Sequence, residues 1–116
     1  MESSINKPWS YTVRCEFPDD ALQKEWLTWL LDGHAQALLD AGAVSAAVVA
    51  DASDPLRLEV RYVFPSRAAF QRYETKYAPA LRNDGLNRFP PHLGIGYQRG
   101  EGPILTSMST ADDQLS

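Results

Sequence analysis

Two histidines, one cysteine and scattered arginines are the residues of this chain whose types could support chemistry. His34 comes first, because imidazole gains and loses a proton near neutral pH and because its neighbours at helical spacing are apolar. A core histidine hydrogen-bonded to a backbone carbonyl is the ordinary interpretation. The alternative is a general base or a ligand contact in a cleft between a helix and a sheet. His34 is therefore the candidate catalytic residue.

Arg14, Arg61 and His92 are the candidate ligand-binding residues, because all three are predicted to lie on one face of a β-sheet. The guanidinium groups of Arg14 and Arg61, on adjacent strands, could bind a carboxylate. Glu16 and Glu59 occupy the same face and could neutralise both arginines instead, which is the interpretation we favour.

Neither a metal centre built from protein ligands nor a cofactor is expected. The chain has two histidines and one cysteine, and no histidine, cysteine or carboxylate stands at metal-ligand spacing from His92. The single cysteine, Cys15, excludes an intrachain disulfide and fits a reducing compartment. Because Cys15 falls in a predicted strand, we expect a buried and unreactive thiol.

The length and charge of the chain predict one globular domain and exclude several kinds of partner. It has 116 residues and a formal net charge of −4, with a pI near 5.0. Nucleic acids and anionic membranes need clustered lysine and arginine, and here these residues are scattered. The amino terminus lacks the apolar core of a signal peptide, and no run reaches the roughly 18 apolar residues of a membrane helix. We expect a cytoplasmic protein without nucleic-acid or membrane partners.

The element that must position His34 is the longest run with helical apolar spacing, residues 25–42. Its apolar arc is roughly 200° wide, about twice what contact with one sheet requires, so we expect it to be covered by more than its own sheet. Asp19 or Asp20 is the expected N-cap. Gly33 in the middle costs on the order of 1 kcal/mol relative to alanine, which predicts a bend or a close contact there.

Alternation of apolar and polar residues predicts the strands of the sheet. Two segments alternate strictly, one is a short apolar run between turn signals, and one alternates with glycine on one side. In chain order the four predicted strands are residues 9–17, 43–50, 56–64 and 92–99.

A second helix is predicted to begin at the cap residue Ser66. Pro79 lacks a backbone donor, so we expect a break near Tyr77 or Ala78, followed by one more turn up to Gly85. Beyond a domain of residues 1–99, residues 100–116 are polar and aperiodic, and we expect a largely disordered tail.

The order strand, helix, strand, strand, helix, strand is the ferredoxin-like βαββαβ pattern of the α+β class. Right-handed crossovers place both helices on one face of a four-stranded antiparallel sheet. The other face then carries the mixed charges of the strands together with small residues and the bare Gly94 and Gly96. It is either a solvated face or the surface through which two subunits stack into a dimeric α+β barrel with a half-polar interior.

Two segments resemble the small bacterial proteins of the domain of unknown function 4286 family. The first is Glu25-Trp-Leu-Thr-Trp-Leu-Leu-Asp-Gly-His34 with the Leu-Leu-Asp-Ala-Gly42 that follows, and the second is Arg72-Tyr-Glu and Tyr77-Ala-Pro-Ala-Leu-Arg-Asn-Asp-Gly-Leu-Asn-Arg-Phe89. The resemblance extends from about Tyr11 to Arg99 and does not include the tail. It implies a place among the dimeric α+β barrels, and hence a ferredoxin-like fold and a homodimer. It implies no established activity and transfers no catalytic residues.

Three functions follow from these observations. Binding or sensing of a small-molecule ligand by a dimeric barrel is the one we expect. The alternative, whose type is implied by the oxygenases and isomerases of the dimeric α+β barrel group, is a cofactor-independent enzyme acting on a small organic substrate with His34 as base. The third is an interaction protein without a pocket. An accessible cavity at His34 would favour the enzyme, a cavity at Arg14 and Arg61 would favour ligand binding, and solid packing would leave the third.

Overall fold

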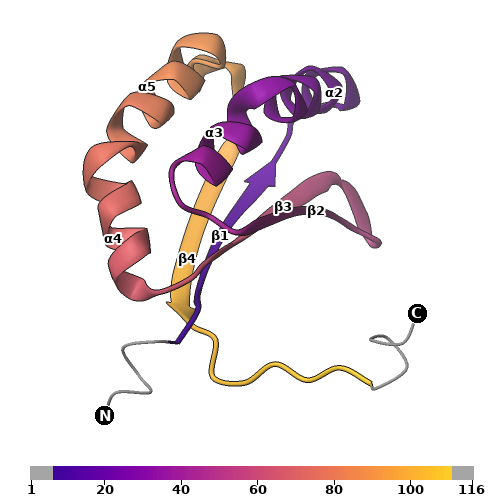
Figure 1. Ribbon diagram of the computed structural model, residues 1–116. Coiled ribbons are helices and arrows are strands. Elements are labelled where there is room, and N and C mark those ends of the chain that lie inside the picture. Colours follow the sequence, from indigo (N-terminus) through magenta and orange to yellow (C-terminus); the bar gives the residue numbers. More distant parts are fainter. Residues whose placement is uncertain (1–6, 111–116) are drawn as a thin grey trace.

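The alternating segments of the sequence form one antiparallel sheet in the computed structural model, which describes residues 7–110. The strands lie in the order β2-β3-β1-β4 (Figure 1). Their bounds are β1 (Trp9–Glu16), β2 (Ser45–Asp51), β3 (Asp54–Phe64) and β4 (Gly96–Pro103). With helices after β1 and β3, this order confirms the predicted ferredoxin-like α+β fold.

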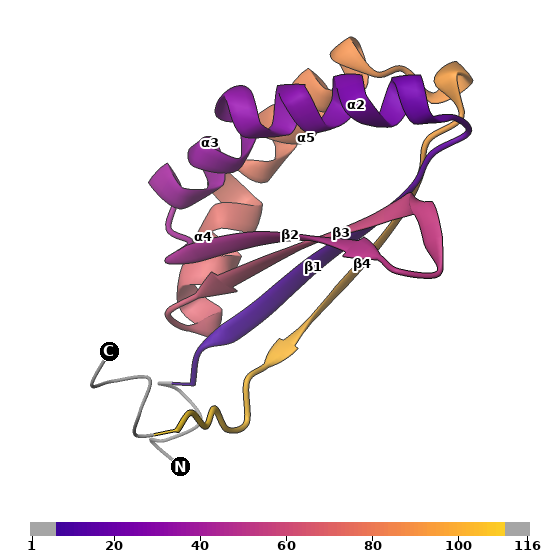
Figure 2. The ribbon, with the colours of Figure 1, turned by 90° about the vertical axis from the view of Figure 1, so that its right-hand side faces the viewer.

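The register of the strands decides which side chains face the helices. Val13 of β1 lies opposite Val60 of β3 and Arg99 of β4. Because side chains alternate along a strand, this register sends one set of residues to the helix side and the other set to the opposite face. The buried set is Tyr11, Cys15, Leu58, Val60, Tyr62 and Phe64. Figure 2 shows the helices on one face of the sheet only, which leaves the other face open.

The first helical segment is bent at its glycine. It comprises α2 (Asp20–Trp29), the π-helical turn η1 (Leu30–His34) and α3 (Ala35–Asp40). Asp19 is the N-cap, and its Oδ1 accepts the Leu22 backbone N–H at 2.8 Å. Gly33 has φ +142°, and a Cβ built on it would meet no atom within 4 Å. The predicted irregularity at Gly33 is therefore a bend and not a close contact.

The second helical segment breaks where the sequence predicts. Helix α4 (Arg67–Lys76) begins at Ser66, whose Oγ accepts the Ala69 N–H at 3.1 Å, and α5 (Ala78–Arg88) follows directly. Pro79 stands in the first turn of α5, where a backbone donor is not needed. The predicted end at Gly85 is wrong, because this glycine is helical and its carbonyl accepts the Phe89 N–H at 2.8 Å.

The last strand begins and ends four residues later than predicted. His92 and Gly94 are not in it: Pro91–Leu93 form the 3₁₀ turn η2, and Gly94 follows with φ +89°. Pro90 and Pro91 account for the later start of the strand, since they supply no backbone donors for a strand ladder and fix φ values that suit a tight turn.

The shifted strand also moves the edge of the domain. Residues 100–103, predicted to be part of the tail, pair with β1 as far as Pro103 opposite Trp9. Ile104 extends the pairing by donating its backbone N–H to the Pro8 carbonyl at 2.9 Å. Residues 105–110 continue as exposed coil, and the rest of the predicted tail, residues 111–116, lies outside the described residues. Between residues 7 and 110, no helix is long and apolar enough to cross a membrane.

Candidate functional site

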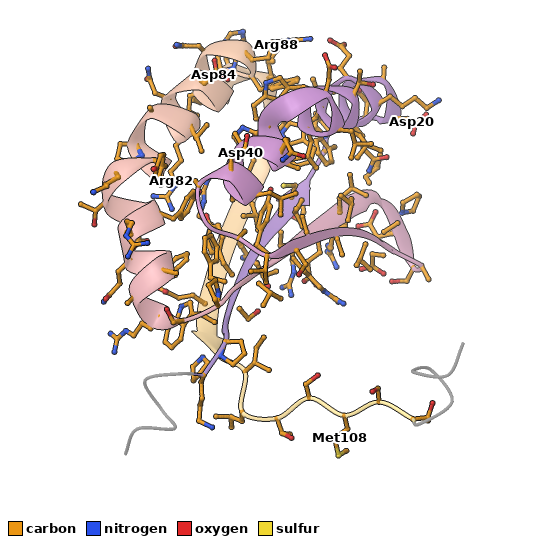
Figure 3. The ribbon with its side chains drawn as sticks, in the orientation of Figure 1. Asp20, Asp40, Arg82, Asp84, Arg88 and Met108 are labelled. Atoms are coloured by element: carbon orange, nitrogen blue, oxygen red, sulfur yellow. The ribbon has the colours of Figure 1, made fainter. Side chains whose placement is uncertain are left out.

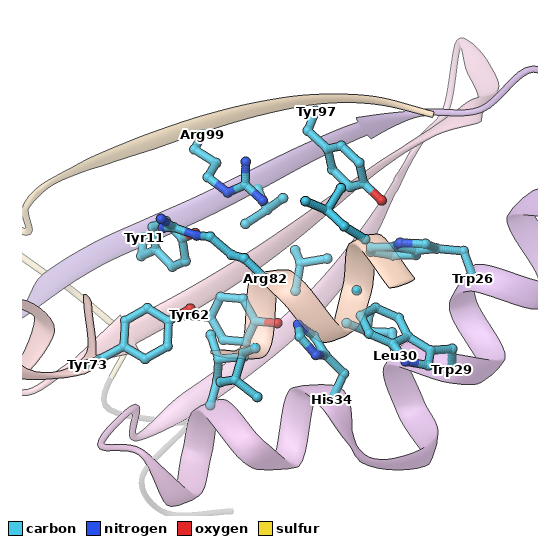
Figure 4. A pocket seen from close by; sticks show the side chains of 16 residues that line it. Tyr11, Trp26, Trp29, Leu30, His34, Tyr62, Tyr73, Arg82, Tyr97 and Arg99 are labelled. Carbon is cyan, nitrogen blue, oxygen red and sulfur yellow. The ribbon is translucent and has the colours of Figure 1, made fainter. Parts of the chain in front are cut away.

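A cavity of about 190 Å³ lies between the helices and the buried face of the sheet. Figure 4 shows His34 and Trp29 entering it from the first helical segment, Arg82 from α5, and Tyr97 and Arg99 from β4. Most of the wall is aromatic or aliphatic. The lining residues are Tyr11, Val13, Trp26, Trp29, Leu30, His34, Leu38, Val60, Tyr62, Tyr73, Leu81, Arg82, Gly85, Leu86, Tyr97 and Arg99.

His34 stands in the wall of this cavity, which is the placement that the cleft interpretation requires. It ends the π-helical turn, and its ring stacks on the ring of Trp29 with centroids 4.1 Å apart and planes 25° from parallel. Burial lowers the pKa of His34 below its ordinary value of 6.5, and the negative charge of Asp84 partly opposes this shift. His34 is therefore neutral at pH 7, with a ring nitrogen able to accept a proton.

Arg82 brings a guanidinium group to the inner side of α5, whereas Arg88 lies at the outer end of the same helix (Figure 3). Nη2 of Arg82 donates to the Tyr11 hydroxyl oxygen at 3.3 Å and lies 3.9 Å from Oε2 of Glu74. Its Nε is buried and has no hydrogen-bond partner. A buried donor without an acceptor costs free energy. Arg82 therefore has one donor, Nε, that a further acceptor would stabilise.

Arg99 brings a second guanidinium group to the same cavity from the edge strand β4. Its guanidinium carbon lies 5.5 Å from the centre of the Tyr97 ring, within the range of a cation–π contact. Among the described residues it forms no ion pair. Both arginines favour the ionised form of Tyr73, but burial dominates and raises the pKa of Tyr73 above its ordinary value.

Gly85 allows the aromatic wall to approach α5. A Cβ built on Gly85 would lie 3.3 Å from the Trp29 ring, which is tighter than an ordinary contact. The Trp29 ring therefore packs directly on the helix backbone. This close approach explains why α5 keeps a glycine in its interior, where glycine is otherwise unfavourable.

Arg14 and Arg61 lie on the open face of the sheet, outside this cavity. Nη2 of Arg14 is 3.1 Å from Oε2 of Glu59, and Nε of Arg61 is 2.6 Å from Oε1 of the same residue. Hydrogen bonds from Arg61 and then Arg14 hold the pKa of Glu59 below its ordinary value. Glu59 thus pairs with both arginines, whereas Glu16 pairs with Arg57 at 2.8 Å.

The structure does not bring His92 to the two arginines of the open face. His92 lies exposed on η2, outside the strand that was predicted to carry it. The hollow lined by Arg14 and Arg61 contains Glu59, Arg57 and residues of β2 instead.

Arg82 and Arg99 are the site residues that the sequence analysis missed. Arg82 lies on the same side of a helix as Leu81 and Gly85. Because the predicted helix ends at Gly85, Arg82 falls in its last turn, where the pattern gives no reason to expect that the side chain faces inward. Strand alternation places Arg99 on the same face as Tyr97. Residue 99 is the last of the predicted strand, and a terminal position carries little evidence of which way its side chain faces.

Solved structures with the same fold include proteins of several kinds. One is a dimeric ferredoxin-like protein from an uncultured marine organism (TM-score 0.65, 12% identity, 96% of this chain and 99% of that chain). Another is SnoaB, a cofactor-independent oxygenase from Streptomyces nogalater (TM-score 0.68, 10% identity, 90% and 99%). A third is a monooxygenase from the gene ActVA-Orf6 of Streptomyces coelicolor in complex with Nanaomycin D (TM-score 0.69, 14% identity, 91% and 95%). At these identities the likeness shows the fold alone.

Sequence comparison identifies the family. No curated protein sequence matches the chain. A family model matches residues 10–94, a span that includes both helical segments and three of the four strands. The chain therefore belongs to the DUF4286 family, which is described as a domain of unknown function.

Proposed function

We propose that this protein binds a small organic molecule in the cavity between its helices and its sheet. The observation that carries the proposal is an apolar cavity of about 190 Å³ into which a neutral histidine and two arginines are directed. Small-molecule sites are usually concave and apolar with a few convergent polar groups. A region that served packing alone would be filled to the density of a protein interior.

Ligand-observed NMR with a library of small organic fragments tests this proposal. Leu86 lines the cavity and is 48% exposed, so Leu86→Trp narrows the cavity without displacing the buried core. Leu105→Trp is the control, because Leu105 is 73% exposed and does not line the cavity. We expect fragments that bind the wild type and Leu105→Trp, and bind Leu86→Trp at least about tenfold more weakly. If no fragment binds, or if Leu86→Trp binds as well as the wild type, the proposal fails.

We further infer that two copies pack through the open faces of their sheets into a dimeric barrel. Gly96, Gly100 and Gly102 all lie on this face of β4, and a Cβ built on Gly100 or Gly102 would meet no atom within 4 Å. Where β4 presents glycine, no side chain of that strand holds a second sheet away from the roughly 10 Å spacing of stacked sheets. The marine ferredoxin-like proteins, described as dimeric, also support this arrangement.

The dimer proposal redefines the role of Arg14 and Arg61. In a barrel they would line the interior together with Glu59, which already bonds to both of them. Both are already bonded to a carboxylate within one subunit, so we assign them to the contact between sheets and not to the binding of an anionic ligand.

A cofactor-independent enzyme with His34 as base is the second candidate. The observation that favours it is a neutral imidazole in the cavity wall that makes no side-chain hydrogen bond to the described residues. Such a group can accept a proton from an acidic C–H or O–H of a bound molecule. An enzymatic role is also supported by two proteins of the same fold, which are described as a cofactor-independent oxygenase and a monooxygenase.

Proton exchange measures this activity directly. For a bound fragment with an acidic C–H, we expect the wild type in D₂O to accelerate loss of that proton signal. His34→Gln should bind the fragment with similar affinity and lose the acceleration. Exchange that persists in His34→Gln would exclude His34 as the base.

A further inference from the structure

The ionisable side chains that line the cavity are unbalanced in charge. Arg82 and Arg99 both line it, and the lining contains no aspartate or glutamate. The carboxylate nearest to Arg82, that of Glu74, is half exposed and 3.9 Å from Nη2, at the limit of an ion pair. Arg82 is partly buried and Arg99 is exposed, and two like charges that line one cavity favour an anion between them. The cavity is therefore suited to a negatively charged guest.

The hydrogen-bonding state of Arg82 supports the same conclusion. Its Nη2 donates to Tyr11, but its Nε is buried and has no acceptor among the described residues. Nε and one Nη of a guanidinium group together form the fork that binds a carboxylate through two parallel hydrogen bonds. A small rotation of the Arg82 side chain would present this unpaired donor to an acceptor from outside the chain.

The rest of the wall selects for a flat ring. Trp29 and His34 are stacked on one another, and Tyr11 and Tyr62 are stacked with centroids 5.9 Å apart. Aromatic side chains hold flat guests through offset-stacked and edge contacts. The cavity of about 190 Å³ is smaller than the roughly 300–1,000 Å³ of sites for drug-sized ligands, so one or two fused rings are the appropriate size.

We propose, on the basis of the small-molecule function proposed above, that the ligand of this cavity is a small aromatic carboxylate. Its ring lies among Tyr11, Trp29 and Tyr62, and its carboxylate binds Arg82 and Arg99. A carboxylate suits this site because it offers two oxygens in the plane of the ring, which can serve two guanidinium groups in a narrow space. Figure 4 shows both arginines on the side of the cavity near Tyr11, with Trp26 and Trp29 at the other end.

Isothermal titration with three matched probes tests the charge of the ligand. The probes are 2-naphthoate, its neutral analogue 2-naphthamide, and the cation 2-naphthylmethylammonium. Because a charge-assisted hydrogen bond contributes more than a neutral one, we expect 2-naphthoate to bind at least about tenfold more tightly than 2-naphthamide. The ammonium probe should be the weakest of the three.

Two variants locate the binding site of the carboxylate. Arg82→Gln and Arg99→Gln should each weaken 2-naphthoate binding by roughly ten- to hundredfold, and each should change 2-naphthamide binding by less than about threefold. Arg88→Gln is the matched control, because Arg88 also lies on α5 but pairs with Glu25 at 3.5 Å and does not line the cavity. The variants stand on different elements, so a folding defect in one of them, visible in its melting curve, leaves the other informative.

The outcomes separate this inference from the function on which it rests. If 2-naphthamide binds as tightly as 2-naphthoate, or if a preference for 2-naphthoate survives both arginine substitutions, the carboxylate assignment is overturned while small-molecule binding stands. If neither these probes nor any library fragment binds, both proposals fail together.

Discussion

Cys15 is fully buried and His34 is partly buried, and in both cases burial favours the neutral form of the side chain. It raises the pKa of the Cys15 thiol to about 12 and lowers the pKa of His34. The chemical consequences are opposite. A neutral thiol is a poor nucleophile, whereas a neutral imidazole is a competent base. One physical effect thus makes the cysteine inert and keeps the histidine usable.

We expect Cys15 to resist alkylation in the folded protein. A thiol with a pKa of about 12 has roughly a thousandfold less thiolate at pH 8 than a free cysteine, and the side chain is fully buried. Iodoacetamide labelling followed by mass spectrometry should show slow modification in buffer and rapid modification in urea. Labelling at similar rates in both conditions would contradict the burial of Cys15.

His34 should make the stability of the protein depend on pH near neutrality. Its pKa in the folded state is below 6.5, so between the two pKa values the unfolded chain binds more protons, and the free energy of unfolding falls as pH drops through 6.5. Urea unfolding at pH 7.5, 6.5 and 5.5 should show this loss in the wild type and a smaller one in His34→Gln. His92→Gln, which removes an exposed imidazole, is the control. Equal losses in all three proteins would show that His34 is not the cause.

At the scale of elements, the bend between α2 and α3 brings His34 to the cavity. Asp32 and Gly33 leave helical dihedral angles inside η1, with Gly33 at φ +142° and ψ −28°. An L-residue with a side chain rarely adopts this conformation, whereas glycine does so readily. Glycine at position 33 therefore allows one apolar segment to turn and continue over the sheet.

Substitution of this glycine isolates the cost of the bend. We expect Gly33→Ala to lower the free energy of unfolding by about 1–3 kcal/mol, the usual cost of a strained backbone conformation. No steric clash contributes, because a Cβ there meets no atom within 4 Å. Gly100→Ala, also in open space but without a positive φ, is the control and should be neutral or slightly stabilising. Urea unfolding measures the free energy of unfolding of both variants. If Gly33→Ala is as stable as the wild type, the bend tolerates a side chain.

The sequence predicts an element well where one pattern dominates it. Strict alternation in β1 and β3 gives their extent to within a residue or two, and Pro79 gives the break between the helices. The predictions fail where two signals conflict. Alternation in residues 92–99 competes with the two prolines before it, and the prolines prevail. In the sequence Gly85 predicts the end of a helix, whereas in the structure its lack of a side chain allows the Trp29 ring to pack against the helix.

The candidate site is predictable only in part for a related reason. His34 is a titratable group in an apolar pattern, and this pattern alone indicates its position. The two arginines of the cavity come from α5 and β4, which are far apart in the sequence and were predicted to end too early. Which cations meet in one cavity depends on tertiary packing, and no local spacing encodes that meeting.

At the scale of the whole molecule, the two faces of the sheet have different chemistry. The helix-covered face carries apolar side chains and the cavity. The open face carries ion pairs such as Arg14–Glu59 together with glycines of β4. Exposed pairs of this kind contribute little to stability, so the open face gives the single subunit little of its stability and is available for contact with a second sheet.

A lysine on the bare part of this face tests the dimer. Light scattering at micromolar concentration should give the wild type a mass of twice the chain mass of 12.9 kDa. Gly100→Lys should have the mass of one chain, because a long charged side chain blocks the close approach of two sheets. The position has open space and no positive φ, so the variant should keep its fold. Thr28→Lys on the exposed side of α2 adds the same charge away from the sheet and should remain dimeric. A wild-type monomer, or a Gly100→Lys protein that stays dimeric, would show that the subunits do not meet through this face.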